Sequence, residues 1–357
     1  GYESDARTEA QAAAKTEHVV TAFGSRHEES SVFDASEILK LIAGAESTTK
    51  KPHIAVVPAE GSIAMGSSSV LSDSGITARA MHRVIRRLAA DDSVKAVVLR
   101  IDSPGGSALA SDLMWHDLME LRKKKPLVTS VANMAASGGY YLACASTKIV
   151  APETSIVGSI GVLGGKIVIS DALAEFGVHA ETFPASPAPG AAARAAYLSP
   201  LAPWDGPTRE KVRKQMEQVY ELFLRRVAEG RGLPVPLVRA VAEGRIWSGS
   251  QGLKIRLVDE IGGLGKALDI ARKLGNVPAD APIVLDGIGE TLLENLFGGS
   301  EGADEASVAS RLASRRETYE RLLGPIAGPL RPFVSSLAPL FAGETTLAVL
   351  PFGLVVK

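Results

Sequence analysis

The regular alternation of apolar, strand-like runs with amphipathic helical segments constrains the fold of this chain more than any other feature. Residues 54–58 (IAVVP) are typical of a buried strand, residues 76–92 carry apolar side chains at helical spacing, and a second apolar run follows at 94–102. The next segments, 107–125 and 126–132, repeat the helix and the strand. Repeated βα units predict a parallel sheet with helices packed on its faces, an α/β fold.

The second half of the pattern is less regular. We expect strands in 148–153 (KIVAPE) and 158–169 (GSIGVLGGKIVI), a short helix over 170–177, a loop over 185–207, a long helix over 207–229 and a last strand over 281–286. The apolar stripe of the long helix suits core packing or contact between subunits. Asp259 and Glu260 are interpreted as a solvated or capping pair, and Trp247 as a packing residue.

Composition and pattern divide the chain into three parts. Residues 1–52 form a lead-in or linker segment with one possible short helix, residues 53–288 form the α/β domain, and residues 289–357 form an extension that is first rich in Gly, Glu and Ser and then apolar. The apolar end of this extension suits packing on the domain or contact with a membrane surface.

Charge and metal-ligand content exclude several functional classes. Lys plus Arg total 39 and Asp plus Glu total 40, so no bulk field attracts phosphate backbones, and nucleic acid is not an expected partner. The single cysteine, Cys144, cannot form an internal disulfide or a thiolate cluster. The six histidines show no ligand spacing, so we expect no metal and no cofactor.

Two Gly-rich turns carry the candidate chemistry. In IDSPGGS (101–107) the amides of Gly105 and Gly106 are candidate donors to an oxyanion, although such residues taken alone more commonly form an ordinary strand-to-helix turn. In MAASGGYY (134–141) Ser137 stands among small residues where a helix begins, as a nucleophile or as a helix cap. None of the six histidines stands in a context that suggests a base, which leaves a neutral lysine as the alternative.

Four segments in this order resemble the signal peptide peptidase A family of membrane-associated serine peptidases: VKAVVLRIDSPGGSALAS, MAASGGYYLACA, IVGSIGV (156–162) and RIWSGSQGLKIRLVDEIGG (245–263). The resemblance implies the crotonase-like fold shared with the Clp protease subunit, and a Ser/Lys dyad. It implies Ser137 as nucleophile, Gly105 and Gly106 in the oxyanion hole, and a base-orienting role for Ser159.

The base lysine is where the chain departs from the family pattern. In short members of the family it precedes an SP dipeptide, and the matching position here is Ala195, preceded by Arg194, whose guanidinium stays protonated. Long members contain two tandem copies of the fold, with the lysine in the N-terminal copy. We therefore expect this chain to be the C-terminal catalytic half, with the base in an upstream half. Lys166 is the nearest internal alternative, but a lysine at an apolar strand end more commonly extends to solvent.

The expected function is hydrolysis of released signal peptides and other short apolar peptides by a homo-oligomer, with an extended peptide added beside a strand edge. By resemblance the protein is associated with the inner membrane and its catalytic part is periplasmic. One alternative is a non-catalytic crotonase-like scaffold or peptide-binding module that lacks its base, which Ala195 favours. Another is an acyl-CoA enzyme of the same fold, against which the MAASGG and RIWSG segments argue.

Overall fold

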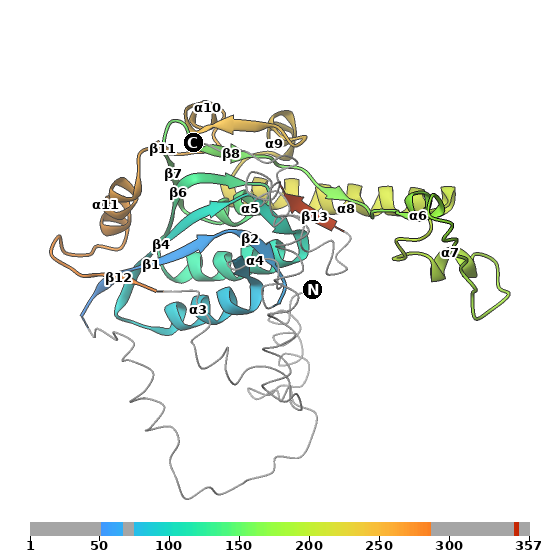
Figure 1. Cartoon of the computed structure of the whole chain (residues 1–357). Coiled ribbons are helices and arrows are strands. Elements are labelled where there is room, and N and C mark those ends of the chain that lie inside the picture. Colours follow the sequence, from blue (N-terminus) through green and yellow to red (C-terminus); the bar gives the residue numbers. More distant parts are fainter. Residues whose placement is uncertain (1–50, 67–74, 287–345, 350–357) are drawn as a thin grey trace, which may run out of the picture. The chain divides into compact units, whose positions relative to one another are not determined.

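The computed structural model describes residues 51–66, 75–286 and 346–349 (Figure 1). The chain divides into two units, Gly1–Thr48 and Thr49–Lys357. The first unit and the helix expected within it lie outside the described residues.

A mostly parallel sheet forms the centre of this unit, as the βα alternation predicted. In the described residues its strands run in the order β10–β8–β6–β4–β1–β12, with β7 beside β6 and β11 beside β7, and β10 antiparallel to β8. The strands are β1 His53–Glu60, β4 Val94–Ser103, β6 Leu127–Ala136, β7 Lys148–Ala151, β8 Ile156–Gly158, β10 Ile246–Ser248, β11 Glu260–Ile261 and β12 Ile283–Leu285.

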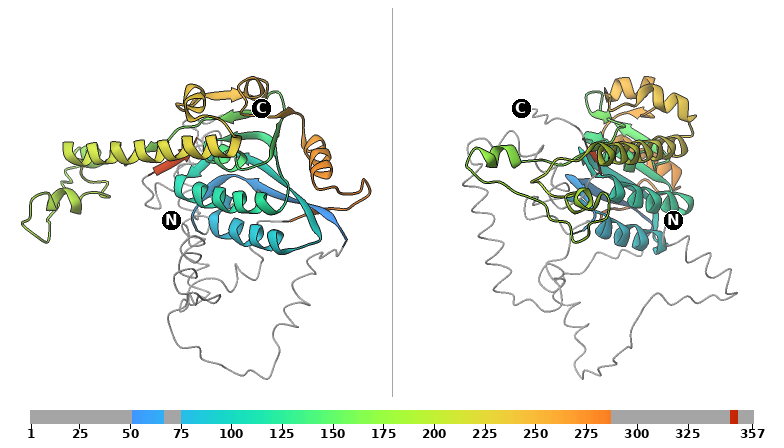
Figure 2. Two further views of the ribbon diagram at one scale, coloured as in Figure 1. Left: turned by 180° about the vertical axis from the view of Figure 1, so that it is seen from behind. Right: turned by 90° about the vertical axis from the view of Figure 1, so that its right-hand side faces the viewer.

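Helices cover both faces of the sheet, because alternate residues of each strand point to opposite faces. On one face Ala55 and Val57 pack in the cluster formed with α3, α4, α5 and α8; on the other, Ile54 and Val56 pack with α11 (Figures 1 and 2). The helices are α3 Ala78–Ala90, α4 Ala108–Lys124, α5 Gly138–Ala143, α8 Gly206–Arg231, α9 Val235–Val241, α10 Gly249–Lys254 and α11 Leu264–Leu274.

A second, smaller sheet lies at the edge where the parallel strands end. Its described strands run in the order β3–β2–β5–β13–β9. They are β2 Ser62–Ala64, β3 Gly75–Thr77, β5 Gly105–Ser107, β9 Leu163–Gly164 and β13 Thr346–Val349. Strand β13 comes from the segment expected to be an extension, so at least these four residues pair with the α/β domain.

Residues 165–205 form an arm that differs from the prediction. No strand is found over 165–169, where Ile167, Val168 and Ile169 are exposed instead of paired in a sheet. The expected loop contains a short helix, α7 (Ala191–Ala195), and α6 (Ser170–Ala174) precedes it. In both figures α6 and α7 lie away from the central sheet, toward the end at which α8 begins.

Candidate active site

The predicted nucleophile and the predicted oxyanion glycines follow adjacent parallel strands. Strand β4 pairs with β6 in a register that sets Ser103 beside Ala135. Ser137 therefore follows the end of β6 at the same sheet edge where β5, with Gly105 and Gly106, follows β4, and α5 packs against β5. Topology thus brings together two motifs that are about thirty residues apart in sequence.

The backbone of Ser137 is strained. Its φ of 52° and ψ of −112° lie outside the regions that L-residues commonly adopt. Such a conformation costs about 1–3 kcal/mol and persists only when its surroundings hold it. Here the Ser137 amide donates to the Gly158 carbonyl at 2.8 Å, and the Ser137 carbonyl accepts from the Tyr141 amide at 2.8 Å. Strand β8 and helix α5 therefore hold this residue from opposite sides.

The Ser137 hydroxyl does not cap α5, although Ser137 occupies the N-cap position. By contrast, the capping side chains of Thr77, Ser107, Asp205 and Ser248 each accept a hydrogen bond from a helix amide. The Ser137 Oγ is fully buried and has no hydrogen-bond partner among the described residues. A buried hydroxyl without a partner costs about 1–3 kcal/mol. The helix-cap interpretation is therefore wrong, and the structure gives this hydroxyl no role in holding the fold.

Close approach of neighbouring backbone requires glycine in both motifs. A Cβ on Gly106, whose φ is 154°, would lie 2.2 Å from the Ile63 carbonyl oxygen in β2, and a Cβ on Gly139 would lie 2.7 Å from the Ser103 carbonyl oxygen. Gly105 has a φ of 103°, and its amide donates to Ser103 Oγ at 3.1 Å. To donate to an oxyanion, the Gly105 amide would have to share its hydrogen with Ser103 Oγ or give up its bond to that atom.

Strand β13 fills a position one strand wide next to these glycines. It is antiparallel to β5, with Ala348 opposite Gly106 and Val349 opposite Gly105. On its other side it is antiparallel to β9, with Thr346 opposite Gly164. It also lies against α5, the helix that begins one residue after Ser137. The two edges that β13 joins, β5 and β9, could pair with any extended peptide in its place.

Ser159 lies close to Ser137 because it follows Gly158, whose carbonyl accepts a hydrogen bond from the Ser137 amide. It is almost fully buried and also has a positive φ, 50°. Its amide donates to the Arg245 carbonyl at 2.8 Å. The structure therefore places the Ser159 backbone between the residue that holds the Ser137 amide and the 245 carbonyl, and its base-orienting role stays a prediction.

Within residues 51–66 and 75–286, no side chain forms a hydrogen bond with the Ser137 hydroxyl. Because Ser137 Oγ has no hydrogen-bond partner, no described lysine ammonium lies within bonding distance of it. Ala195 ends α7 on the arm, and the Arg194 guanidinium donates to the Pro189 carbonyl within the same arm. The Lys166 ammonium donates to the carbonyls of Ala196 (2.8 Å) and Ser199 (3.1 Å), and desolvation lowers its pKa. Lys166 thus cross-links the arm in this structure.

The two tyrosines of the MAASGGYY motif anchor α5, a role that the sequence analysis did not assign. The Tyr140 hydroxyl donates to the Leu257 carbonyl at 2.8 Å, and the Tyr141 hydroxyl donates to Asp112 at 2.8 Å. Burial raises the pKa of both phenols, so each hydroxyl stays protonated and keeps donating. Their adjacency to Ser137 in the sequence was the available signal.

Asp259 is not the solvated or capping residue that was expected. Its carboxylate accepts from the Arg231 guanidinium at 2.8 Å and from the Ile149 amide at 2.8 Å, and the Arg231 side chain is only 6% exposed. Sequence pattern could not show this pair, because α8 brings Arg231 to the 259 turn only in the folded domain.

Neither a metal centre nor a membrane span is found in the parts of the chain that the structure describes. No group of three or more His, Cys, Asp or Glu side chains is placed to hold a metal ion there. None of the helices within those ranges combines the length and the apolar character needed to cross a bilayer.

Comparison with known proteins matches the same part of the chain. Peptidase family S49 matches residues 119–278, and the Clp protease family matches residues 61–167. The chain is 32% identical over 314 residues to the chloroplastic serine protease SPPA of Arabidopsis thaliana (81% of this chain, 45% of the relative), and 36% identical over 231 residues to Protease 4 of Haemophilus influenzae (64% and 36%). It is 35% identical over 221 residues to a putative protease of Methanocaldococcus jannaschii (62% and 68%). The match therefore spans less than half the length of the first two relatives.

Proposed function

Because this chain belongs to peptidase family S49, with an α/β fold of the Clp protease type, we propose that it is a serine peptidase in which Ser137 is the nucleophile. One observation carries the proposal: a serine in the N-cap position has a strained backbone, a buried hydroxyl without a partner, and no capping bond. Strain and unsatisfied polar atoms concentrate at functional sites, because such sites are selected for chemistry rather than for stability.

The reaction that this arrangement supports is amide hydrolysis through an acyl-enzyme. Ser137 Oγ attacks the peptide carbonyl carbon and passes its proton to a neutral lysine amine, which then protonates the departing amine. Backbone amides of Gly105 and Gly106 donate to the oxyanion of the tetrahedral intermediate. Water attacks the resulting ester by the same proton route and restores the serine.

We propose that the base lysine comes from an N-terminal half, as the resemblance implies, and that Ser159 orients it. Two observations support this: Ala195 carries no amine, and Lys166 is engaged with the arm carbonyls of Ala196 and Ser199. Under this proposal the 357-residue chain alone has no peptidase activity. Activity of the isolated chain would instead show that a residue within it acts as base.

The substrates we propose are released signal peptides and other short apolar peptides, bound as one extended strand between β5 and β9. The main-chain position of β13 supports this mode, since it shows that one antiparallel strand fits there. Ser137 is fully buried in this structure and β13 lies against α5, so under this proposal the substrate takes the place of β13 to reach the serine.

We also propose a homo-oligomer whose interface includes the arm. The arm exposes large apolar side chains that a soluble surface does not need, and two of its phenylalanines, Phe176 and Phe183, are 83% and 80% exposed. The others are Ile167, Val168, Ile169, Val178 and Leu198. Changing both phenylalanines to serine should lower the mass measured by light scattering to that of a smaller species. The inner-membrane, periplasmic location stays a prediction from the resemblance, to be tested by fractionation.

The test of the nucleophile uses the longest natural polypeptide that contains this chain. A fluorophosphonate probe should label it at Ser137, and Ser137→Ala should abolish both labelling and peptide hydrolysis while the oligomer persists. The second candidate function, a peptide-binding module without catalysis, is favoured by Ala195; it predicts peptide binding without any labelling. Labelling or hydrolysis that survives Ser137→Ala removes Ser137 from the mechanism.

A further inference from the structure

The conformation of Ser137 depends on a second turn, at Gly158 and Ser159, where strand β8 ends. Gly158, whose carbonyl accepts the Ser137 amide, has a φ of 91°, and Ser159 after it has a φ of 50°. Two consecutive residues with left-handed φ values do not hold themselves, because an L-residue such as Ser159 is disfavoured there. Something outside the 158–161 segment has to fix them.

The turn at 243–245 supplies this support through main-chain contacts. The Ser159 amide donates to the Arg245 carbonyl at 2.8 Å, and the Gly244 amide donates to the Ile160 carbonyl at 2.9 Å. The two segments approach so closely that a Cβ on Gly161 would lie 3.0 Å from the Gly244 Cα. A shift of the turn is therefore passed directly to Ser159 and Gly158.

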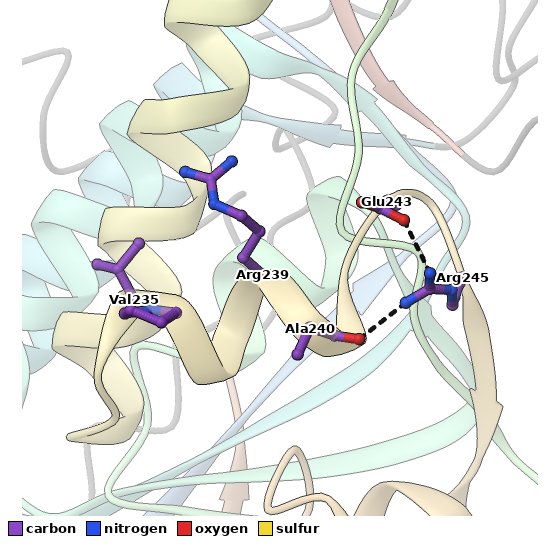
Figure 3. Close-up of a pocket in the computed structure, with 6 residues that line it drawn as sticks. Val235, Arg239, Ala240, Glu243 and Arg245 are labelled. Atoms are coloured by element: carbon purple, nitrogen blue, oxygen red, sulfur yellow. Dashed lines mark hydrogen bonds and ion pairs between the residues drawn. The ribbon is translucent and has the colours of Figure 1, made fainter.

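The turn is itself strained, and two side chains bond to it: the Tyr220 hydroxyl accepts from the Glu243 amide at 3.2 Å, and the Arg245 guanidinium bridges the turn. Glu243 and Gly244 have φ values of 61° and 72°, so a non-glycine residue again adopts a left-handed conformation. The Arg245 guanidinium donates to the Ala240 carbonyl at 2.8 Å and to the Glu243 carboxylate at 2.8 Å (Figure 3). These two bonds join the end of α9 to the strained residue Glu243. The backbone carbonyl of the same arginine accepts the hydrogen bond from the Ser159 amide.

We propose that Arg245 is a positioning residue: its guanidinium fixes the 243–245 turn, the turn fixes Gly158 and Ser159, and Gly158 fixes Ser137. The inference rests on the proposed function of Ser137 and adds a residue to it. Arg245 acts through these contacts and does not need to touch the substrate.

A neighbouring arginine provides a matched control. Arg239 and Arg245 both line a surface cavity of about 490 Å³ (Figure 3). Each forms an ion pair, Arg239 with Glu221 at 2.6 Å and Arg245 with Glu243 at 2.8 Å, and their side chains are 44% and 48% exposed. Exposed pairs of this kind contribute about 0–1 kcal/mol to stability, so losing either should have a similar small effect on unfolding. Arg245 donates to the Glu243 carboxylate within the turn itself. Arg239 reaches the turn only through Tyr220, because its guanidinium lies 5.9 Å from the centroid of the ring whose hydroxyl accepts from the Glu243 amide.

The experiment compares Arg245→Ala, Arg245→Lys and Arg239→Ala in the full chain by hydrogen exchange, and in the longest natural polypeptide by fluorophosphonate labelling. Arg245→Ala should speed exchange of the Ser137 and Ser159 amides about tenfold and slow labelling at Ser137 about tenfold or more, because small displacements of reacting groups cost that much. Arg245→Lys should partly restore both the slow amide exchange and the labelling rate, since an ammonium can replace one of the two guanidinium hydrogen bonds. Arg239→Ala should leave both within twofold of the wild type.

The outcomes separate this inference from the proposed function. Equal effects of Arg245→Ala and Arg239→Ala on exchange overturn the positioning role, whatever the labelling shows. A wild-type protein that is not labelled, while the exchange difference persists, overturns the catalytic proposal and leaves the structural link between the turn and Ser137 standing. A large drop in thermal stability confined to Arg245→Ala would assign the residue to folding instead.

Discussion

Strand β13 should compete with substrate, and disrupting it should raise affinity for peptides. The register sets three residues of β13 opposite β5 and two opposite β9. About four main-chain hydrogen bonds at about 0.5–1.5 kcal/mol each stabilise it by a few kcal/mol, and ordering four residues costs about 4–8 kcal/mol. The two contributions nearly cancel, so we expect the strand to be held by no more than about 2 kcal/mol.

The perturbation is Ala348→Pro. A residue in a strand paired on both sides directs its amide to one neighbour or the other, so proline there removes a ladder bond and strains the strand. If pairing of β13 is favourable by up to about 2 kcal/mol, β13 is unpaired in only a fraction of the wild-type molecules. Because only those molecules bind peptide, the apparent peptide affinity is weakened by about 2- to 30-fold. Ala348→Pro should raise the apparent peptide affinity by the same factor.

The assay is binding of a fluorescent apolar peptide, followed by anisotropy, in a Ser137→Ala background. This measurement does not depend on where the base lysine comes from. Hydrogen exchange of Gly105–Ser107 should also become faster in the Ala348→Pro protein when no peptide is present. Unchanged or weaker peptide binding, with unchanged exchange at β5, would refute the idea that β13 occupies the substrate position in solution.

Three further predictions concern the fold around the site. Gly106→Ala should lower the thermal unfolding temperature by several degrees or more, since its Cβ would lie 2.2 Å from the Ile63 carbonyl oxygen; an unchanged midpoint contradicts the close approach. Burial raises the pKa of the Cys144 thiol to about 12, so a thiol reagent at pH 8 should react only after unfolding, and fast reaction in native buffer would show that the thiol is accessible. Hydrogen bonds from Ser93 lower the pKa of Asp91 below its unfolded value, so its contribution to stability is present at neutral pH and is lost as the pH falls through the folded pKa. Ser93→Ala should therefore reduce the loss of stability on acidification, measured by denaturant unfolding between pH 7 and pH 2.5.

Local pattern was sufficient for the parallel core and for the identity of the candidate residues. Strands β1, β4 and β6 and helices α3 and α4 fall where apolar periodicity placed them, because a strand buried on both faces and a helix buried on one each require a distinct spacing of apolar side chains. Ser137, Gly105 and Gly106 were identified from short motifs, because small residues around a turn are a property of the sequence itself. Their catalytic roles remain predictions.

The tertiary structure decided what each candidate residue contacts. Whether Ser137 caps its helix depended on a backbone conformation that the Gly158 carbonyl helps to hold. The pairing of Gly106 with Ala348 joins residues more than two hundred positions apart, so it forms only in the folded domain. The exposure of residues 167–169 in the arm and the Arg231–Asp259 pair likewise could not be predicted from periodicity. Sequence spacing reports which face of an element is apolar, but hydrogen bonds between distant segments form only when packing of the whole domain brings their ends together.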